Sequence, residues 1–591
     1  MKKLLRMALA TVLACGLCLS AGAAAPASAR AGVGGTIQVG LAYSSGALTA
    51  ANLENNSGYG AGYRLGYFDD ALNFVELGRT GADTTKLTVL RTCEIYYNSA
   101  GYTDQVPSGD YQTIGCYHVV LDSYDTYEEA LADSANHPGS FVAWISGQYQ
   151  LRQGAYATKE EAVAAMQSLG GLEVKGTSAY AVNVVSTGST KILFQFDGGS
   201  STPFGVMPDV TGKSEVRTWF KGFRYQGGFR YERIGGGKLT VVNIVDLETY
   251  IKGVIPYEMN NAWPLEALKA QAVCARSYGY NKLQEHSHGA SNFDICTTEH
   301  CQVYRGVGSG VSNYQANERT DRAVEETSGM YALYDGNPIW AYYSSSHGGA
   351  SEQIDLVWSS DFKKFPYIAG VVDPYEQAVA HLNSYSYWMK TWTKDELTKR
   401  LRARGYAVNT RVDSLDLTYS ERGNVIRVRV NYENGKYNDF TPKMDFGVRS
   451  LFGVSSLHFT INGQGAQAGA AQSSGQVMVN QTQTVDSTQP LYVLSGAGES
   501  SRLDAESLYV ITAGGTVSQL LTEDGAQSKP NSTTPAGTVV HVTGSRFVVE
   551  GAGNGHQLGM SQYGAYAMAE QGFTYDEIIK FYYTGVRVDG L

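Results

Sequence analysis

A glutamate inside an apolar segment is the first candidate for chemistry. Glu258 stands among Pro256, Tyr257, Met259 and Trp263. Apolar surroundings raise the pKa of a carboxyl group and keep it protonated near neutral pH, which suits a general acid. The alternative interpretation is a glutamate close to a helix N-terminus, where the helix dipole favours its charge.

A second cluster of reactive side chains follows about thirty residues later. Two cysteines and several histidines lie within sixteen residues, in His286-Ser-His288 and Cys296-Thr-Thr-Glu-His-Cys301. Two thiolates with two imidazoles fit tetrahedral zinc, and four protein ligands would make the ion structural because no position is left for water. The spacing leaves open which earlier imidazole is the fourth ligand. A Cys296–Cys301 disulfide is the alternative.

Several function classes are disfavoured. The chain has no G-x-S-x-G, P-loop or H-E-x-x-H motif, which removes common hydrolase, nucleotide and zinc-protease signatures. Adjacency alone gives little support to a serine nucleophile in Tyr343-Ser-Ser-Ser-His347. With 46 basic against 56 acidic side chains, broad binding of nucleic acid is not expected.

Two elements must position Glu258. The run 238–245 predicts a strand that leads into the glutamate segment, and the residues from about Pro264 to Lys282 predict a helix. Pro264 suits the first helical turn, because its missing N–H has no partner there, and Glu266 complements the helix dipole.

The N-terminus predicts export. Lys2, Lys3 and Arg6 precede the apolar stretch Met7 to Leu19, and Ala27-Ser28-Ala29 is a small-residue cleavage site. We therefore expect a secreted mature chain without a transmembrane segment; a lipoprotein anchored at Cys15 is the alternative. An odd number of cysteines remains, and Cys93 with Cys116 is either a disulfide or two thiols.

The composition changes along the chain and predicts a multidomain α+β protein, with a mixed β-sheet and helical core. The predicted divisions are a signal peptide at 1–29, a β-rich module at 30–116, a small α+β module at 117–175, a core block at 179–461, a linker and β-like insertion at 462–545, and a C-terminal motif at 546–591.

A weak repeat organises the small module. Asp125-Thr-Tyr-Glu-Glu-Ala130 returns as Ala157-Thr-Lys-Glu-Glu-Ala162, each after a strand-like run, with Thr126 and Thr158 placed as helix N-caps. With Gln153-Gly-Ala-Tyr156, the segment resembles the sporulation-related repeat (SPOR) domain. That resemblance implies binding to peptidoglycan glycan strands without stem peptides. A plain α+β spacer is the alternative.

Longer motifs carry a stronger resemblance. They are Asn243 to Met259, Trp263 to Tyr278, Ala341 to Gly349, Val357-Trp358, Pro366-Tyr-Ile368, Arg449 to Phe459, Gly555 to Ala565 and Phe581-Tyr-Tyr583. In this order they resemble the stage II sporulation protein D family, which includes the amidase enhancers called LytB. Two features depart from the family pattern: the insertion near 462–545, and Gly555-His556-Gln557 in place of the usual Gly-His-Gly.

The resemblance implies a peptidoglycan lytic transglycosylase with Glu258 as the catalytic acid. Such an enzyme cleaves the β-1,4 bond between N-acetylmuramic acid and N-acetylglucosamine and leaves a 1,6-anhydro end, so the chain would be associated with the cell wall. A hydrolase would need a second carboxylate, and nothing in the spacing of Glu248, Glu266 and Asp294 selects one. The rival is a non-catalytic enhancer of an N-acetylmuramoyl-L-alanine amidase, which would make a cell-wall amidase the partner.

The same resemblance points to the remaining site residues. Cys296, His300 and Cys301 match three of the ligands of a zinc ion found in some family members, and we take His288 as the fourth. Lys269 and Arg276 lie near one face of the predicted helix and are candidates for substrate binding, although surface cations that pack on their neighbours are the alternative. Further candidates lie in two family motifs: Tyr343, Ser344, Ser345, His556, Ser561, Gln562 and Tyr563.

Overall fold

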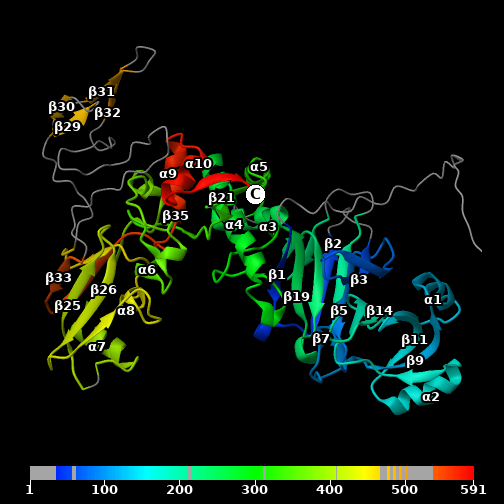
Figure 1. Ribbon diagram of the computed structural model, residues 1–591. Helices are drawn as coiled ribbons and strands as arrows, with labels where there is room; N and C mark the ends of the chain where they lie inside the picture. Colours follow the sequence, from blue (N-terminus) through cyan, green and yellow to red (C-terminus); the bar gives the residue numbers. More distant parts are fainter. Residues whose placement is uncertain are drawn as a thin grey trace, which may run out of the picture.

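The computed structural model describes residues 35–55, 62–210, 216–309, 315–407, 409–465 and 537–591, together with the backbone of four short strands between 476 and 503. Several β-sheets, many of them with antiparallel pairings, occur together with helices, which confirms the α+β class (Figure 1). The predicted signal peptide lies outside the described residues, and so does most of the 462–545 insertion.

A seven-stranded sheet joins the N-terminal residues to the segment before Glu258. Its order is β20 (Ile295–Cys296), β1 (Thr36–Ala42), β19 (Thr240–Asp246), β18 (Gly228–Glu232), β15 (Phe204–Pro208), β3 (Tyr63–Phe68) and β4 (Phe74–Arg79). β1 runs antiparallel to β19 and parallel to β20. The strand expected at 238–245 is therefore a central strand of this sheet.

A ten-stranded sheet contains the rest of the N-terminal lobe. Its order is β12 (Glu173–Lys175), β9 (Tyr117–Tyr124), β11 (Gln148–Tyr156), β10 (Ser140–Ile145), β14 (Ile192–Asp197), β13 (Val182–Ser186), β5 (Lys86–Arg91), β2 (Ala50–Asn55), β16 (Thr218–Phe220) and β17 (Phe223–Tyr225). Strands from 30–116, 117–175 and 179–225 thus share one sheet. The separate β-rich module predicted at 30–116 is not formed, because β2 and β5 bury Leu53 and Val89 against residues of later strands such as Val184.

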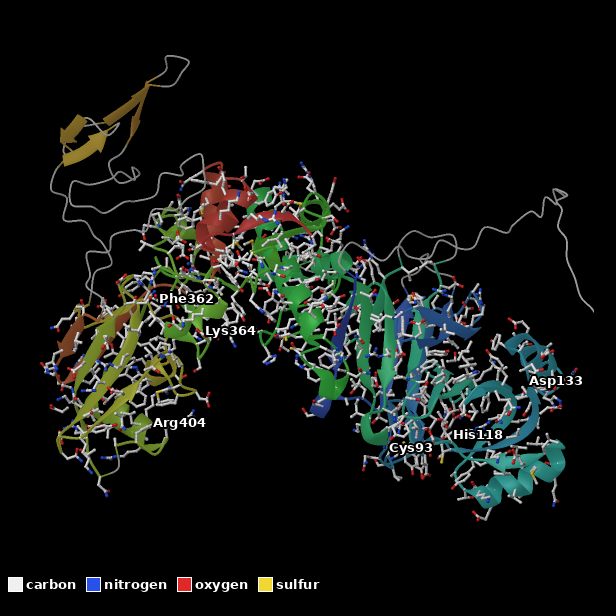
Figure 2. The ribbon with its side chains drawn as sticks, viewed as in Figure 1. Cys93, His118, Asp133, Phe362, Lys364 and Arg404 are labelled. Carbon is white, nitrogen blue, oxygen red and sulfur yellow. The ribbon has the colours of Figure 1, made fainter. Side chains whose placement is uncertain are left out.

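The small module at 117–175 has the order β9, α1 (Tyr127–Ser134), β10, β11, α2 (Lys159–Leu169) and β12. The side chains of Thr126 and Thr158 each accept a hydrogen bond from the backbone N–H of a glutamate three residues on, and the carboxylate of that glutamate accepts one from the backbone N–H of the threonine. These two capping boxes confirm the predicted helix starts. His118, on β9, is buried, and its ring nitrogen Nε2 lies 2.8 Å from Gln195 Nε2 on β14. Figure 2 labels His118 and also Asp133, which belongs to α1.

Helices fill the middle of the molecule (Figure 1). The helix predicted after Glu258 is α4 (Leu265–Glu285), and it packs against α3 (Leu247–Glu258), α5 (Glu318–Glu325), α9 (Gln562–Glu570) and α10 (Tyr575–Tyr582). Its small residues, among them Ala270, Ala272 and Ala275, are fully buried, which allows neighbouring helices to approach closely.

The second lobe is built around two sheets. One has the order β27 (Tyr437–Phe440), β26 (Val425–Tyr432), β25 (Val412–Tyr419) and β33 (Val539–Val542), and the other has β24 (Trp388–Thr393), β34 (Arg546–Gly551) and β28 (Phe459–Ile461). The helices of this part are α6 (Ile354–Val357), α7 (Lys394–Arg402) and α8 (Val448–Phe452). Because β33 and β34 pair with strands that precede the insertion, the C-terminal segment returns to the same lobe.

Smaller strand groups complete the description. They are β22 (Asn337–Pro338) with β21 (Met330–Tyr334) and β36 (Arg587–Gly590), β23 (Tyr343–Ser344) with β35 (Met560–Ser561), β7 (Gly101–Thr103) with β6 (Ile95–Asn98) and β8 (Gln112–Ile114), β29 (Gln476–Val479) with β30 (Gln483–Asp486), and β31 (Leu491–Leu494) with β32 (Ser500–Leu503). The β23–β35 pair brings together two motifs that are far apart in sequence.

Candidate active site and metal centre

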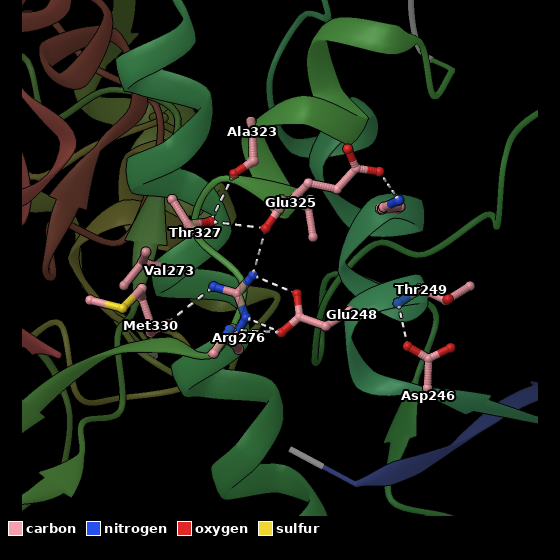
Figure 3. A network of polar contacts seen from close by, with 12 residues as sticks. Asp246, Glu248, Thr249, Val273, Arg276, Ala323, Glu325, Thr327 and Met330 are labelled. Atoms are coloured by element: carbon pink, nitrogen blue, oxygen red, sulfur yellow. Dashed lines mark hydrogen bonds and ion pairs between the residues drawn. The ribbon is translucent and has the colours of Figure 1, made fainter. Parts of the chain in front are cut away.

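Glu258 is the last residue of α3. The helix begins at Asp246, whose side chain accepts a hydrogen bond from the backbone N–H of Thr249, 2.9 Å away (Figure 3). A carboxylate at the C-terminal end of a helix is disfavoured by the dipole. The alternative of a glutamate stabilised at a helix N-terminus is therefore wrong, and Glu258 has no local structural reason to be an acid.

The carboxyl group of Glu258 is enclosed by three distant segments. Its Oε1 accepts a hydrogen bond from the backbone N–H of Val303 at 3.2 Å, its Oε2 accepts one from Gln562 Nε2 at 3.5 Å, and the Tyr343 hydroxyl also bonds it. These bonds favour the charged form, but burial outweighs them and raises the pKa of Glu258 to about 7. The residue as a whole is half-buried, so Glu258 is not sealed off completely from solvent.

Gln302 holds Tyr343 in place. Gln302 is 2% exposed; its Nε2 donates to the Tyr343 hydroxyl at 3.1 Å, and its Oε1 accepts from the Tyr250 hydroxyl at 3.0 Å. The tyrosine hydroxyl is therefore oriented toward Glu258. Sequence reasoning missed Gln302, and its only signal was its place directly after the Cys296–Cys301 cluster.

The two family motifs form one continuous structure around Tyr343. Its carbonyl oxygen lies 2.9 Å from His556 Nε2, while His556 Nδ1 accepts from the backbone N–H of Leu558 at 3.1 Å. This pairing requires the neutral ring, and burial lowers the pKa of His556 to about 4. The Tyr563 backbone N–H donates to the Ser345 carbonyl at 3.1 Å, which fixes the second point of contact between the motifs.

Ser344 lies against Gly555. A Cβ atom at Gly555 would stand 2.2 Å from Ser344 Oγ, so only glycine fits there. The Ser344 hydroxyl is buried without a hydrogen-bond partner among the described residues.

The departure from Gly-His-Gly has a structural explanation. Gln557 has φ +65°, a left-handed backbone that favours glycine. Its side chain donates to the His347 carbonyl at 2.7 Å and accepts from the Leu457 backbone N–H at 3.2 Å. Two buried hydrogen bonds offset the backbone cost of the glutamine.

Glu376 is the first residue of a short 3₁₀ helix (Glu376–Leu382). It forms hydrogen bonds with both the motif that contains Tyr343 and the motif that contains Ser561. Its carboxylate accepts from the backbone N–H groups of His347 and Gly348, each at 2.7 Å, and from the hydroxyls of Ser346 and Ser561. Ser561 is fully buried and also caps α9 by accepting from Gly564 N–H, so it positions Gln562 instead of facing substrate. Glu376 was missed from the sequence because it belongs to none of the motifs.

The two predicted helix cations do not reach this site. Arg276 is fully buried and forms a bidentate ion pair with Glu248, with both N–O distances 2.7 Å (Figure 3). Lys269 pairs with Glu266 at 2.8 Å and Glu326 at 2.7 Å. The prediction that Arg276 binds substrate is wrong because it has no accessible surface. Lys269 likewise ties α4 to the end of α5.

The four predicted metal ligands come together in space. The donor atoms of His288, Cys296, His300 and Cys301 all lie within 4.8 Å of one another. Cys301 Sγ lies 3.3 Å from His288 Nε2 and 3.4 Å from His300 Nδ1, and Cys296 Sγ lies 3.8 Å from His300 Nδ1. Ligands on tetrahedral zinc lie about 3.3 to 3.8 Å apart, as follows from Zn–N and Zn–S bonds of about 2.0 and 2.3 Å. The donor set therefore fits zinc, and the two cysteines are not disulfide-bonded.

The cysteine cluster and the acid are connected through the chain. Cys301 is followed by Gln302, which orients Tyr343, and by Val303, whose backbone N–H donates a hydrogen bond to Glu258.

The other pair considered from the sequence, Cys93 and Cys116, is not a disulfide, because both are free thiols. Figure 2 shows Cys93 in the N-terminal lobe. Within the described ranges, no helix combines the length and apolar character needed to cross a membrane.

Comparisons with known proteins agree with the resemblance. The family described as "Stage II sporulation protein" matches residues 235–334. The chain is 31% identical over 345 residues to the amidase enhancer of Bacillus subtilis (strain 168), covering 57% of this chain and 40% of that protein. It is 23% identical over 354 residues to stage II sporulation protein D of the same organism, covering 59% and 75% of the two chains. The chain thus spans about two fifths of the length of the amidase enhancer.

Proposed function

From the premise that this chain belongs to the stage II sporulation protein D and amidase enhancer family, we propose that it is a secreted peptidoglycan lytic transglycosylase. It would cleave the β-1,4 bond between N-acetylmuramic acid and N-acetylglucosamine and leave a 1,6-anhydro end. The observation that carries the proposal is the carboxyl group of Glu258, which has a pKa of about 7 and is bonded by Val303 and Gln562.

One carboxyl group is enough for this reaction. Protonated Glu258 gives its proton to the glycosidic oxygen as the bond to the anomeric carbon breaks. The resulting carboxylate then accepts the proton of the muramyl 6-hydroxyl as that oxygen closes on the anomeric carbon. A pKa near 7 leaves the group protonated for the first step and able to accept a proton in the second.

The acids that a hydrolase would use are engaged elsewhere. Glu248 is paired with Arg276, and Asp294 lies 2.6 Å from His286 Nδ1. Glu266 accepts from Lys269 and, at 2.8 Å, from the backbone N–H of Tyr575. None of these three therefore forms the carboxylate pair of a hydrolase with Glu258, which favours the transglycosylase reaction.

The surroundings of Glu258 suit a sugar. Tyr343 and Gln562 offer neutral polar groups beside the acid, and the Tyr563 ring packs on Trp263 with ring centres 5.0 Å apart. Hydroxyls, amides and aromatic faces match the polar edges and apolar faces of N-acetylated sugars. Ser344, Ser345 and His556 shape this surface through the backbone.

The decisive experiment is the analysis of products from denuded glycan. The native protein should release fragments with 1,6-anhydro-muramyl ends, detected by mass spectrometry, and Glu258→Gln should release none. Glu299→Gln is the matched control, because this exposed acid lies close enough to influence Glu258 without bonding it. If the native protein gives no anhydro products, the enzyme proposal fails.

The second candidate is a non-catalytic enhancer, favoured by the relative named amidase enhancer. The same surface would then present glycan to an N-acetylmuramoyl-L-alanine amidase. Adding the protein to such an amidase acting on intact peptidoglycan distinguishes the two. Stimulation that survives Glu258→Gln would support the enhancer, whereas stimulation lost together with the anhydro products would support the enzyme.

Zinc is the proposed ligand of the cluster His288, Cys296, His300 and Cys301. The donor chemistry and spacing fit, and the ion would hold the loop that carries Gln302 and Val303. The zinc ion would have a structural role only, because protein side chains would fill all four of its coordination positions. Elemental analysis of the purified protein should give one zinc per chain.

Two further expectations belong to this proposal. The SPOR-like module at 117–175 would bind denuded glycan, and the exported chain would begin near residue 30. Pull-down of the intact protein with denuded glycan, and the N-terminal sequence of the mature protein, test them separately.

A further inference from the structure

A polar pocket of about 330 Å³ lies at one end of the ten-stranded sheet. Its lining includes Asn52, Glu54, Lys86, Thr187, Trp219 and Lys221, from β2, β5, β16, the turn after β16 and the loop after β13. None of these residues belongs to the motifs around Glu258. The volume is at the lower end of the range for small-molecule sites, about 300 to 1,000 Å³.

The strand register explains why these side chains share a face. Glu54 pairs with both Lys86 and Trp219 across the sheet, and Asn52 pairs with Thr88. Directly opposite residues point to the same side, and alternate residues along a strand do as well. The intervening Leu53 and Leu87 are buried in the core, so the pocket occupies the outer face.

The floor of the pocket is fixed by hydrogen bonds. The Thr88 hydroxyl lies 2.8 Å from Asn52 Oδ1 and 2.9 Å from the Thr187 hydroxyl. Because Asn52 uses its oxygen in this contact, its amide NH₂ is the end that can donate to a ligand. An amide donor and a hydroxyl beside an indole are groups that suit an N-acetylated sugar.

One cation lies over the indole and two more line the pocket. The guanidinium carbon of Arg224 lies 5.4 Å from the ring centre of Trp219, and Arg224 Nε donates to the Gly308 carbonyl at 3.3 Å. Lys86 pairs with Glu54 at 3.0 Å, and exposed Lys221 adds a further positive charge. Three cations against one carboxylate favour an anionic ligand.

We propose that this pocket is a second glycan site, which binds an N-acetylated sugar that carries a free carboxylate. The inference rests on the proposed function, because the muramyl lactyl group of denuded glycan is such a carboxylate. Trp219 stacks on the sugar, Asn52 and Thr187 bond its polar groups, and Lys221 binds the carboxylate. Sugars without a carboxylate, such as chitin fragments, bind it less well.

The pocket is connected to the Glu258 segment. Phe223, in the hairpin that carries Trp219, has its ring centre 6.4 Å from that of Tyr257, and Arg305 lies 4.8 Å from the Phe223 ring centre. A glycan strand long enough to occupy both sites would be held at two points, which increases its apparent affinity beyond that of either site alone.

Fluorine NMR of the full chain tests the pocket directly. The chain has seven tryptophans, so 5-fluorotryptophan labelling gives seven signals, and Trp219→Phe identifies one of them. The measurement uses the Glu258→Gln protein to prevent cleavage and adds denuded tetrasaccharide or chitotetraose. Trp263 reports on the Glu258 site in the same spectrum, because it packs on Tyr563.

The expected result is a saturable shift of the Trp219 signal with denuded tetrasaccharide, and at least five-fold weaker binding of chitotetraose at this signal. Lys221→Gln should weaken the first titration at least three-fold and leave the second unchanged, whereas Lys191→Gln, an exposed lysine outside the pocket, should change neither. A Trp219 signal that does not move, or that moves equally with both sugars, overturns the inference. A shift of Trp263 alone would leave the proposed function intact while removing this site.

Discussion

Replacing the acid should stabilise the protein as it abolishes the reaction. An ordinary glutamate titrates near 4.5, and Glu258 near 7, so the folded state binds this proton more tightly than the unfolded state. Below pH 4.5 the group is neutral in both states and costs nothing. Above pH 7 it is charged in both, and the rise of its pKa from 4.5 to about 7 makes the folded state less stable by about 3 kcal/mol.

Glu258→Gln removes this cost because glutamine carries no charge. The variant should match the native protein near pH 4.5 and gain stability as pH rises, up to about 3 kcal/mol at pH 8. For a cooperative unit of roughly 300 residues, that corresponds to about 5 °C in Tm. Calorimetric scans from pH 4.5 to 8 on both proteins provide the measurement.

If the proposed function is correct, the cleavage activity of the native protein should depend on pH in the opposite direction. The protonated acid is required, so kcat/KM on denuded glycan should fall about tenfold per pH unit above 7. If Glu258→Gln is less stable than the native protein at pH 8, or if its advantage does not change with pH, the carboxyl group is not buried as the structure indicates.

Five further substitutions test the supporting contacts. Arg276→Met should destabilise the fold by about 3 to 5 kcal/mol, because it leaves a carboxylate without its partner, whereas Lys252→Gln, in an exposed ion pair with Glu325, should cost at most about 1 kcal/mol; thermal unfolding checks both. Cys301→Ser should lower bound zinc below one per chain and reduce cleavage although zinc does no chemistry, as elemental analysis and product assays would show. Glu376→Gln should lower kcat more than it raises KM, because one oxygen that accepts from the two motifs becomes a donor. Gln557→Gly relieves the left-handed backbone but loses two hydrogen bonds, so we expect a net loss of about 1 kcal/mol in chemical denaturation.

Local signals in the sequence predicted local structure well. The capping boxes at Thr126 and Thr158 and the helix beginning after Pro264 depend on residues within a few positions of one another. The four residues predicted as metal ligands do lie together in space, because they belong to one short segment; zinc at this cluster stays a prediction.

Pairings between distant residues were not predictable in the same way. Nothing in 30–116 shows that β1 pairs with β19, or that β2 and β5 join a sheet with later strands, because a strand pattern does not specify its partner. Arg276 was placed on a helix surface because its charge normally excludes burial, and its partner Glu248 lies 28 residues away. Gln302 and Glu376 act only through contacts that the fold creates.

The pairing of β23 with β35 also sets the order in which the molecule becomes competent. Gln562 lies 304 residues after Glu258, so a growing polypeptide holds the acid long before it holds the groups that enclose it. During synthesis the unfinished chain has an exposed, ordinary glutamate that ionises near 4.5 and is a poor proton donor at neutral pH. The proposed proton donor would therefore form last, once the C-terminal residues have folded onto the segment that carries Glu258.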